Sequence, residues 1–554
     1  MTEFTDVTDA PKSYDLPLLE SLARDLSALN YTVDGVRQLL GDAAQEAFNR
    51  DQMVPALLAT TNDGGPLATV VRLWLLAEPV APPALAAALP ETGVAGLLAL
   101  GLAREETDPQ STAAQVVAAV DLRPYGWPAS SDGSGGADLW VASDLGAHQR
   151  AGVLPKDHVL GIGQASLTLA QSTIRHPVER ALDLGTGCGI QTFHLLHHAQ
   201  HVVATDISDR ALAFTRFNLL LNAGPLLIDP RHLEDRVELR RGSLLEPVRG
   251  DSFDLVVSNP PFVITPRHQG ESDTDRFTYR DGGMPGDDLV AVLVAELPRI
   301  LSPGGMAQML GNWEIREAED AEEAAAPADD GSLWYARPQS WVAPGTDAWF
   351  IQREEIGPLQ YAETWLRDAA EGRDLGLYGQ AYVDYLADFA SRRVRGIGFG
   401  MIWLRRRGNR ENPDAGAAGL RRFEEIRHPV EQPIGPHLAA AVERADWLAA
   451  ADLPAAHLIV ADDVTEERHQ RPGAEHPGVI LLRQGAGLRR TNLMSTELAG
   501  FVSACHGELA AGQIAGALSA LLAWEDDGGA EGRIGRLLED VGNLVRDGFL
   551  VPVG

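Results

Sequence analysis

The chain has 554 residues, a net charge of −32 and 45% hydrophobic residues. This length exceeds what one hydrophobic core supports and predicts about three domains. The chain contains no apolar run of the roughly 18–20 residues that a membrane-spanning helix needs, and its polar, acidic start is not expected to be a secretory signal. Two cysteines, Cys188 and Cys505, are too few for a disulfide framework or a zinc cluster. We therefore expect a reducing, cytoplasmic location.

The strong negative charge argues against binding nucleic acid through a basic face. One stretch has the opposite balance, because residues 392–427 contain ten arginines and four acidic residues. These arginines are candidates for phosphate contacts or, alternatively, for salt bridges at the edge of a sheet. The candidates are Arg392, Arg393, Arg395, Arg405, Arg406, Arg407, Arg421 and Arg422.

Residues 1–145 are predicted to form helices followed by a two-stranded hairpin. Five segments have helical apolar spacing: Leu18–Leu29, Val33–Leu40, Val70–Leu76, Ala84–Leu89 and Val94–Leu102. Two strand-like segments, Val116–Leu122 and Leu139–Val141, flank the loop Ser130–Gly136. Helices followed by such a hairpin predict a winged-helix-like N-terminal module.

Residues 146–410 alternate between strand and helix patterns, which is typical of a parallel α/β sheet. The predicted strands are Arg180–Leu184, His201–Thr205, Val237–Arg240, Phe253–Ser258, Gly305–Gly311, Ala348–Gln352 and Phe399–Leu404. We expect the acidic, alanine-rich run Glu314–Asp330 to be a solvated insertion and Leu359–Phe389 to be helical. Seven strands joined by helices predict an α/β, Rossmann-like, mostly parallel sheet.

Residues 411–554 are predicted to form a second winged-helix-like module. They follow a polar linker, Gly408–Gly419. Phe501–Leu522 is expected to form two helices, and Ile534–Gly548 a helix that runs into the strand Phe549–Val551.

A glycine-rich loop, Asp183–Gly189, follows the first predicted strand of the central sheet. Glycines allow a sharp turn and a close approach of the backbone to a ligand. The acid before the first glycine separates this loop from dinucleotide-binding loops, because a carboxylate there would repel a pyrophosphate. Asp206 ends the next strand, where a carboxylate can accept hydrogen bonds from both hydroxyls of a ribose. The alternative role for Asp206 is a helix N-cap.

A second special loop, Asn259-Pro260-Pro261-Phe262, follows the fourth predicted strand. A planar amino nitrogen attacks poorly because its lone pair is delocalised. If the Asn259 side-chain oxygen and the Pro260 carbonyl accept its hydrogens, the nitrogen is held for in-line attack. The prolines fix the backbone, and Phe262 can stack on a planar target. The alternative is a rigid turn that only ends a strand.

Three further segments have open interpretations. Leu160–Thr168, before the first strand, either closes over a ligand or is a plain capped helix. Tyr279–Gly283 is a candidate for the rim of a substrate entrance. His194 and His198 are one helical turn apart, but with no third ligand nearby a helix surface is favoured over a metal site.

Together the two loops resemble those of class I S-adenosylmethionine (SAM)-dependent methyltransferases, in the Asn-Pro-Pro-Phe/Tyr group with a small methyltransferase domain. The resemblance covers roughly residues 150–310. It implies that SAM is the cofactor and that Asn259–Phe262 holds an amino nitrogen for methylation. The cofactor-binding residues that it implies are Asp183, Gly185, Thr186, Gly187, Gly189, Asp206, Ile207, Ser243, Leu244 and Asn259.

The motifs do not specify the methyl acceptor. This group includes release-factor glutamine, ribosomal RNA guanine-N2 and adenine-N6 methyltransferases. The flanking modules and the arginine stretch favour RNA or DNA as the macromolecular substrate, with a protein glutamine amide as the alternative and a small molecule also open. A non-catalytic SAM-sensing regulator is disfavoured, because a sensor has no need of an intact target loop. The oligomeric state is left open.

Overall fold

The computed structural model describes residues 3–107, 114–127, 136–150, 154–267, 281–317, 334–368, 375–408, 419–524 and 529–553. The chain forms two compact units. The first comprises Met1–Ala170 and Pro177–Arg406, and the second comprises Gln171–His176 and Arg407–Gly554. The three-domain division with boundaries at residues 145 and 410 stays a prediction.

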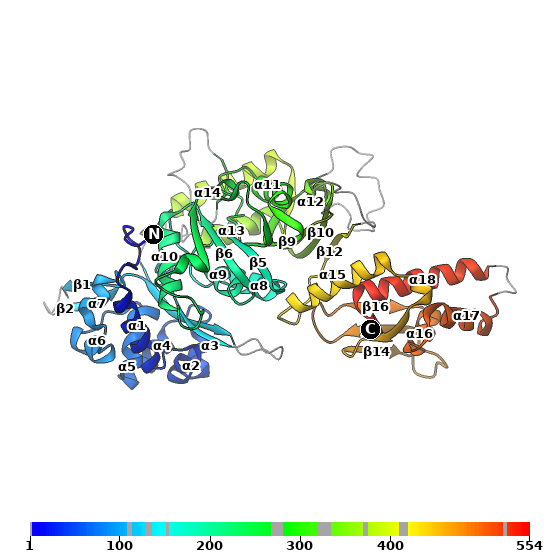
Figure 1. Ribbon diagram of the computed structural model, residues 1–554, viewed down its shortest axis with the longest axis horizontal. Helices are drawn as coiled ribbons and strands as arrows, with labels where there is room; N and C mark the ends of the chain where they lie inside the picture. The colour runs from blue at the N-terminus through cyan, green and yellow to red at the C-terminus, as the bar shows by residue number, and fades with distance from the viewer. Residues whose placement is uncertain are drawn as a thin grey trace. The chain divides into compact units, whose positions relative to one another are not determined.

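The chain begins with a group of short helices in the first unit (Figure 1). They are α1 (Leu16–Ala28), α2 (Val33–Leu40), α3 (Asp42–Phe48), α4 (Val54–Asp63), α5 (Pro66–Val70), a π-helical turn (Val71–Leu75), α6 (Pro82–Ala88) and α7 (Gly93–Ala99). Helix α1 shows why they form: Asp15 caps it by accepting a hydrogen bond from Leu18 N at 3.0 Å. Leu19, Leu22 and Leu26 then form its buried face. The five helices predicted from apolar spacing are present.

Two antiparallel hairpins follow, in place of the single one expected. Strand β1 (Ala103–Thr107) pairs with β2 (Ala114–Ala118), and β3 (Asp121–Trp127) pairs with β4 (Ala137–Ser143). The strand predicted over Val116–Leu122 is divided between β2 and β3. The chain turns between them, where Ala119 N donates to Leu102 O at 3.1 Å. A winged-helix arrangement is not confirmed, and most of the predicted loop Ser130–Gly136 lies outside the described residues.

Seven strands in the described part of the first unit belong to its main sheet. These strands are β5 (Val178–Leu184), β6 (Ala199–Asp206), β7 (Val237–Arg241), β8 (Phe253–Ser258), β9 (Leu301–Arg316), β10 (Thr346–Ile356) and β11 (Val394–Arg406). They lie in the order β10-β11-β9-β8-β5-β6-β7. The five neighbouring strands β9, β8, β5, β6 and β7 are parallel. Strand β11 is antiparallel to both of its neighbours, β10 and β9. The α/β, mostly parallel fold is confirmed, with each predicted strand inside an observed one.

Helices connect these strands and cover the sheet (Figure 1). They are α8 (Gln164–Ser172), α9 (Ile190–Leu195), α10 (Asp209–Leu221), α11 (Asp288–Glu296), α12 (Ala336–Trp341), α13 (Pro358–Asp368) and α14 (Leu375–Ser391). The last two form an insertion between β10 and β11, where one helical segment was expected. One expectation is wrong: Glu314 is not in a solvated insertion but in β9, with no exposed surface, and it pairs with Arg316 and Arg392 at 2.7 Å each. Residues 318–330 of that run lie outside the described part.

Helix α10 binds the hairpin strand β4 through two asparagine side chains. Asn218 and Asn222 are one turn apart and fully buried. Asn222 accepts from Trp140 N at 2.8 Å and donates to Trp140 O at 2.7 Å. Asn218 makes the same pair of bonds with Ala142, at 2.8 and 2.9 Å. Each side-chain amide therefore makes the pair of hydrogen bonds that a residue of a neighbouring strand would make. These bonds fix the hairpin against the helix that follows β6.

The second unit contains four helices and two three-stranded sheets, ordered β17-β13-β18 and β14-β15-β16, within its described residues. Its elements are β12 (Arg421–Glu425), α15 (Gly435–Ala450), β13 (His457–Val460), β14 (Val464–His469), β15 (Val479–Gln484), β16 (Thr491–Met494), α16 (Thr496–Ser503), β17 (His506–Ala510), α17 (Ala511–Leu521), α18 (Ala530–Asp547) and β18 (Leu550–Pro552). The two helices predicted over Phe501–Leu522 are separated by β17. A winged helix is not confirmed here either.

Among the described helices of both units, none has the length and apolar character required to cross a membrane.

Candidate active site

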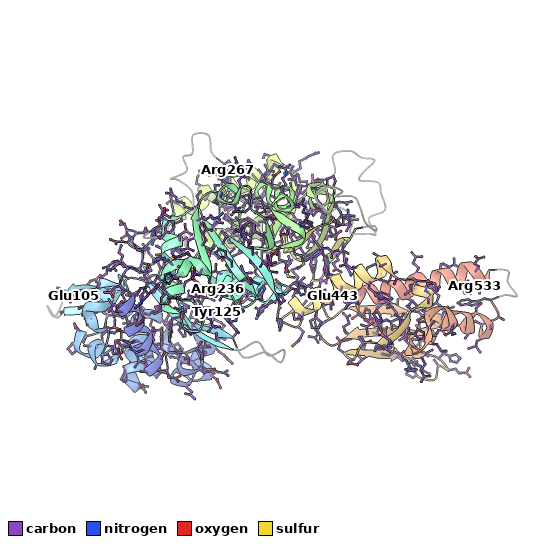
Figure 2. All side chains as sticks on the ribbon, in the orientation of Figure 1. Glu105, Tyr125, Arg236, Arg267, Glu443 and Arg533 are labelled. Atoms are coloured by element: carbon purple, nitrogen blue, oxygen red, sulfur yellow. The ribbon has the colours of Figure 1, made fainter. Side chains whose placement is uncertain are left out.

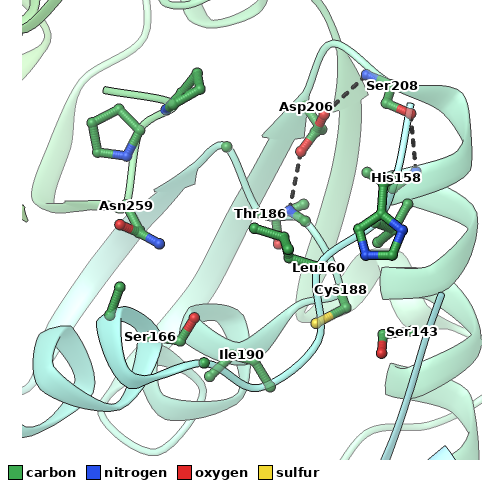
Figure 3. Close-up of a pocket in the computed structure, with 18 of the residues that line it drawn as sticks. Ser143, His158, Leu160, Ser166, Thr186, Cys188, Ile190, Asp206, Ser208 and Asn259 are labelled. Carbon is green, nitrogen blue, oxygen red and sulfur yellow. Dashed lines mark hydrogen bonds between the residues drawn. The ribbon is translucent and has the colours of Figure 1, made fainter. Parts of the chain in front are cut away.

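A cavity of about 660 Å³ opens at the carboxyl ends of β5, β6, β7 and β8 in the first unit (Figure 3). In open α/β sheets this edge is where ligands bind. Most of the predicted cofactor and target residues line the cavity: Gly185, Thr186, Gly187, Asp206, Ile207, Ser243, Leu244, Asn259, Pro260 and Pro261. The fold therefore brings together two loops that are more than seventy residues apart in the sequence.

The glycine-rich loop follows β5 and turns through three left-handed glycines. The φ angles of Gly185, Gly187 and Gly189 are +78°, +57° and +94°, which side chains rarely adopt. Gly185 N and Thr186 N both donate to Thr205 O at 2.9 Å, which ties the loop to the end of β6. A Cβ at Gly185 or Gly187 would meet no atom within 4 Å. Backbone geometry therefore requires these glycines, and their outer face is open to a ligand.

Asp183 lies beneath this loop rather than among the residues that line the cavity. Its Oδ2 atom accepts from Thr192 N at 2.9 Å, from Thr192 Oγ1 at 2.7 Å and from Thr186 Oγ1 at 2.8 Å. Burial raises the pKa of this carboxyl group to about 6, against the lowering effect of those bonds. Its Oδ1 atom is buried and has no hydrogen-bond partner. Asp183 thus fixes the loop and the start of α9, and its binding to the cofactor stays a prediction.

Asp206 ends β6 and faces the cavity. Its Oδ2 accepts from Gly187 N at 3.0 Å and its Oδ1 from Ser208 N at 2.9 Å (Figure 3). Each carboxylate oxygen retains acceptor capacity for a ligand hydroxyl. Burial raises the pKa of this group as well. The alternative N-cap role is wrong, because Ser208 caps α10 by accepting from Ala211 N.

The target loop leaves β8 at Ser258, whose hydroxyl donates to Leu184 O at 2.8 Å. The Asn259 Oδ1 atom is buried without a hydrogen-bond partner, in a side chain that lines the cavity. The Pro260 carbonyl already accepts from Phe262 N at 2.8 Å, so only its second lone pair is open to a substrate. Phe262 is not among the cavity-lining residues and instead pairs with Asp281 in a β-bridge. Its stacking on a target stays a prediction.

Other walls of the cavity come from segments whose role the sequence left open or did not suggest. Leu160–Gly163 and Asp281–Gly283 both line it, whereas their roles in closing over a ligand and in forming a substrate entrance stay predictions. The strand residues Asp121 and Arg123 of β3 also line it, and they form an ion pair with each other. So does His158, which is 4% exposed and whose pKa is lowered by burial. No local motif marks these residues: Asp121 and Arg123 reach the cavity through the docking of the hairpin, and His158 through the segment between β4 and α8.

The arginine stretch forms ion pairs within the protein. Arg392 contacts Glu314 and Asp388 at 2.7 Å each, Arg405 contacts Asp347 at 2.7 Å, and Arg422 contacts Asp547 at 2.6 Å. The last of these pairs lies in the second unit. These guanidinium groups are therefore engaged by carboxylates, as the salt-bridge alternative predicted.

The sheet order, the glycine loop and the Asn-Pro-Pro-Phe loop are similar to those of class I SAM-dependent methyltransferase domains. The residues of the cavity fit SAM: Asp206 offers acceptors for ribose hydroxyls, the glycine loop leaves an open face, and Asn259 offers a buried acceptor beside them. The match to a known family agrees, since residues 146–277 fit the model of the methyltransferase small domain. The resemblance drawn from the sequence is thus confirmed. Residues 28–115 match a domain of unknown function (DUF7059).

Two curated relatives show the same similarity. The ribosomal protein uL3 glutamine methyltransferase of Bradyrhizobium diazoefficiens is 33% identical over 165 residues, which are 28% of this chain and 46% of that protein. The release factor glutamine methyltransferase of Clostridium acetobutylicum is 30% identical over 154 residues, 26% of this chain and 51% of that protein. The chain thus spans about half the length of these relatives. A solved 16S rRNA guanine-N2 methyltransferase of T. thermophilus is 17% identical, covering 39% of this chain and 52% of its own, with a TM-score of 0.22.

The preference for RNA or DNA as the substrate is contradicted by these relatives, which are named for the glutamine of a protein. The physical source of the error is the arginine stretch, in which Arg392, Arg405 and Arg422 are engaged by carboxylates of the protein itself.

Proposed function

We propose that this protein is a SAM-dependent N-methyltransferase that methylates the side-chain amide nitrogen of a glutamine in a protein substrate. The proposal is supported by the named activity of the relatives and by the cavity that joins the cofactor loop to the target loop. The observation that carries it is the Asn259 oxygen, which is buried, lines the cavity and has no hydrogen-bond partner.

Such an oxygen is the group that an amide NH₂ requires. A buried acceptor without a donor costs about 1–3 kcal/mol, and a glutamine amide that enters the cavity supplies the donor. The open lone pair of the Pro260 carbonyl takes the second hydrogen. The two acceptors then hold the nitrogen with its lone pair directed toward the cofactor.

The remaining residues hold the cofactor. Asp206 accepts the ribose hydroxyls, while Ser243 and Leu244 flank the adenine. When bound, SAM supplies an electrophilic methyl group on a sulfonium. No base is needed to activate the amide, because its proton can leave to solvent after the transfer. The cytoplasmic location also stays a prediction.

The test uses the full-length protein with labelled SAM and, separately, purified uL3 and a release factor from the same cell. We expect label in one of the two proteins, and fragmentation of its peptides by mass spectrometry should place one methyl group on a glutamine side chain. The same substrate with that glutamine replaced by alanine is the matched control. Label confined to RNA, DNA or a small molecule, with both proteins unlabelled, contradicts the proposal.

A further inference from the structure

The insertion α13–α14 reaches the target loop through one buried tyrosine. Tyr361 lies in α13 with no exposed surface. It belongs to a cluster of buried residues that includes Ile264, Phe389 and Ile397. Ile264 comes two residues after the end of Asn259-Pro260-Pro261-Phe262. A segment outside the 146–277 match thus packs against the residues that leave the target loop.

The Tyr361 hydroxyl connects the target loop to the neighbouring strand. Its oxygen accepts from Ile264 N at 2.8 Å and from Asn312 Nδ2 at 3.1 Å. Asn312 is fully buried in β9, and β9 pairs in parallel with β8, the strand from which the loop emerges. The target loop begins at the end of β8 and leads to Ile264. The Tyr361 oxygen therefore links the residue after the loop to β9, the strand beside β8.

The loop has few other ways to be held. Pro260 and Pro261 have no N–H to donate. The Phe262 N–H is used inside the loop, on the Pro260 carbonyl. The bond from the Ile264 N–H to the Tyr361 hydroxyl is thus an anchor of the loop to another part of the fold, in addition to the bridge between Phe262 and Asp281.

We propose that Tyr361 is a positioning residue for methyl transfer, whose hydroxyl holds the Asn259–Ile264 loop so that the Asn259 oxygen meets the acceptor amide. This inference rests on the proposed function and adds to it a residue from the helical insertion. A displacement of the loop by about 1 Å is enough to cost up to a hundredfold in rate. The hydroxyl acts through Ile264 and does not touch the reacting atoms.

The aromatic surroundings make a minimal test possible. The Tyr361 ring stacks on Phe399 with centroids 5.8 Å apart and meets Phe389 edge-on at 5.4 Å. In Tyr361→Phe these ring contacts remain and only the hydroxyl is lost. We expect kcat to fall about tenfold while the Kd for SAM stays within twofold of the wild-type value. Hydrogen exchange of the Ile264 amide should become faster in the cofactor-free protein.

Tyr385→Phe is the matched control. Tyr385 is a buried tyrosine of the same cluster, 3% exposed, and its ring also packs against Phe389. The substitution removes a hydroxyl at a place other than the bond to Ile264. We expect wild-type kcat and wild-type exchange of the Ile264 amide.

Three results would overturn the inference: unchanged kcat in Tyr361→Phe, unchanged exchange of the Ile264 amide, or equal losses in both variants, which would show a general role of the cluster in stability. Failure of the proposed function is a separate result, namely that wild-type protein transfers no methyl group to glutamine. The exchange measurement needs no substrate, so it decides the role of the hydroxyl in that case too.

Discussion

The polar groups on the cofactor side and on the target side of the cavity differ in the number of hydrogen bonds that they accept. On the cofactor side, Asp183 accepts three hydrogen bonds and Asp206 two, all from residues of the same loops and their neighbours. On the target side, the Asn259 oxygen accepts none. The cofactor side is therefore held largely by its own hydrogen bonds, with only Asp183 Oδ1 among these carboxylate oxygens left without a partner. Under the proposed function, the Asn259 oxygen gains its donor from the substrate.

This difference separates the two tasks of the site. A loop held by its own carboxylates binds a cofactor without reorganising, since its groups already point where they are needed. An acceptor that lacks a donor is unfavourable in the empty protein and satisfied in the complex. Substitutions in the two halves should therefore affect different constants.

The largest expected effect is that of Asn259→Ala on turnover. Without the amide oxygen, one hydrogen of the acceptor nitrogen has no partner as the bond forms. We expect kcat to fall by about 10²-fold or more, with the affinity for SAM nearly unchanged. Steady-state methyl transfer and calorimetry of SAM binding measure the two constants. Full activity in this variant would show that the target side is not where the nitrogen is held.

A smaller effect is expected from Asp206→Ala, and it should change the affinity for SAM rather than turnover. This substitution removes the acceptor at the end of β6 and also the bond to Gly187 N that shapes the loop. The Kd for SAM should rise about tenfold, as for the loss of one or two hydrogen bonds to a charged group. Asp209→Ala is a suitable control, because Asp209 is a nearby acid that pairs with Arg241 at 3.1 Å. Equal weakening in both variants would indicate a general effect of charge.

The smallest effect concerns Asp183 and pH. Its pKa in the folded protein is about 6, above the ordinary value of 3.8, because burial disfavours the carboxylate. The contribution of the Asp183 carboxyl group to the free energy of unfolding is thus fully present below about pH 3.8 and is lost as the pH rises through 6. Between pH 5 and pH 6 the loss is about 1 kcal/mol. Asp183→Asn should lack this slope when the free energy of unfolding is measured across that range. Parallel curves for the two proteins would contradict the raised pKa.

The positions of the two loops could be predicted from the sequence because each is a local pattern at the end of a buried strand, whereas their binding roles stay predictions. Gly185 and Gly187 indicate left-handed turns, and Leu182 and Val257 lie in apolar runs that a parallel sheet buries completely. The place of Phe262 could not be predicted in this way. Its orientation depends on pairing with Asp281, a partner nineteen residues away.

Other parts of the site depend on contacts that no local pattern marks. Arg123 lines the cavity because the hairpin of β3 and β4 docks there, and His158 lines it from the segment between β4 and α8. Glu314 looked like part of an acidic surface run, but the β9 strand extends far enough to bury it against two arginines. In the second unit, the strand Val464–His469 has no buried residue, so it lacks the alternating hydrophobicity by which a strand is recognised.

The two asparagines of α10 have a consequence for how the chain can be divided. Asn218 and Asn222 each form hydrogen bonds with both the N–H and the C=O of one residue in β4. A shift of the hairpin by one residue would therefore break four buried hydrogen bonds. Asn218 also donates to Cys188 O, inside the glycine-rich loop, at 2.9 Å. A fragment that starts at residue 146 would therefore lose a wall of the cavity and expose these side chains, so the fold that builds the cavity extends beyond the matched residues 146–277.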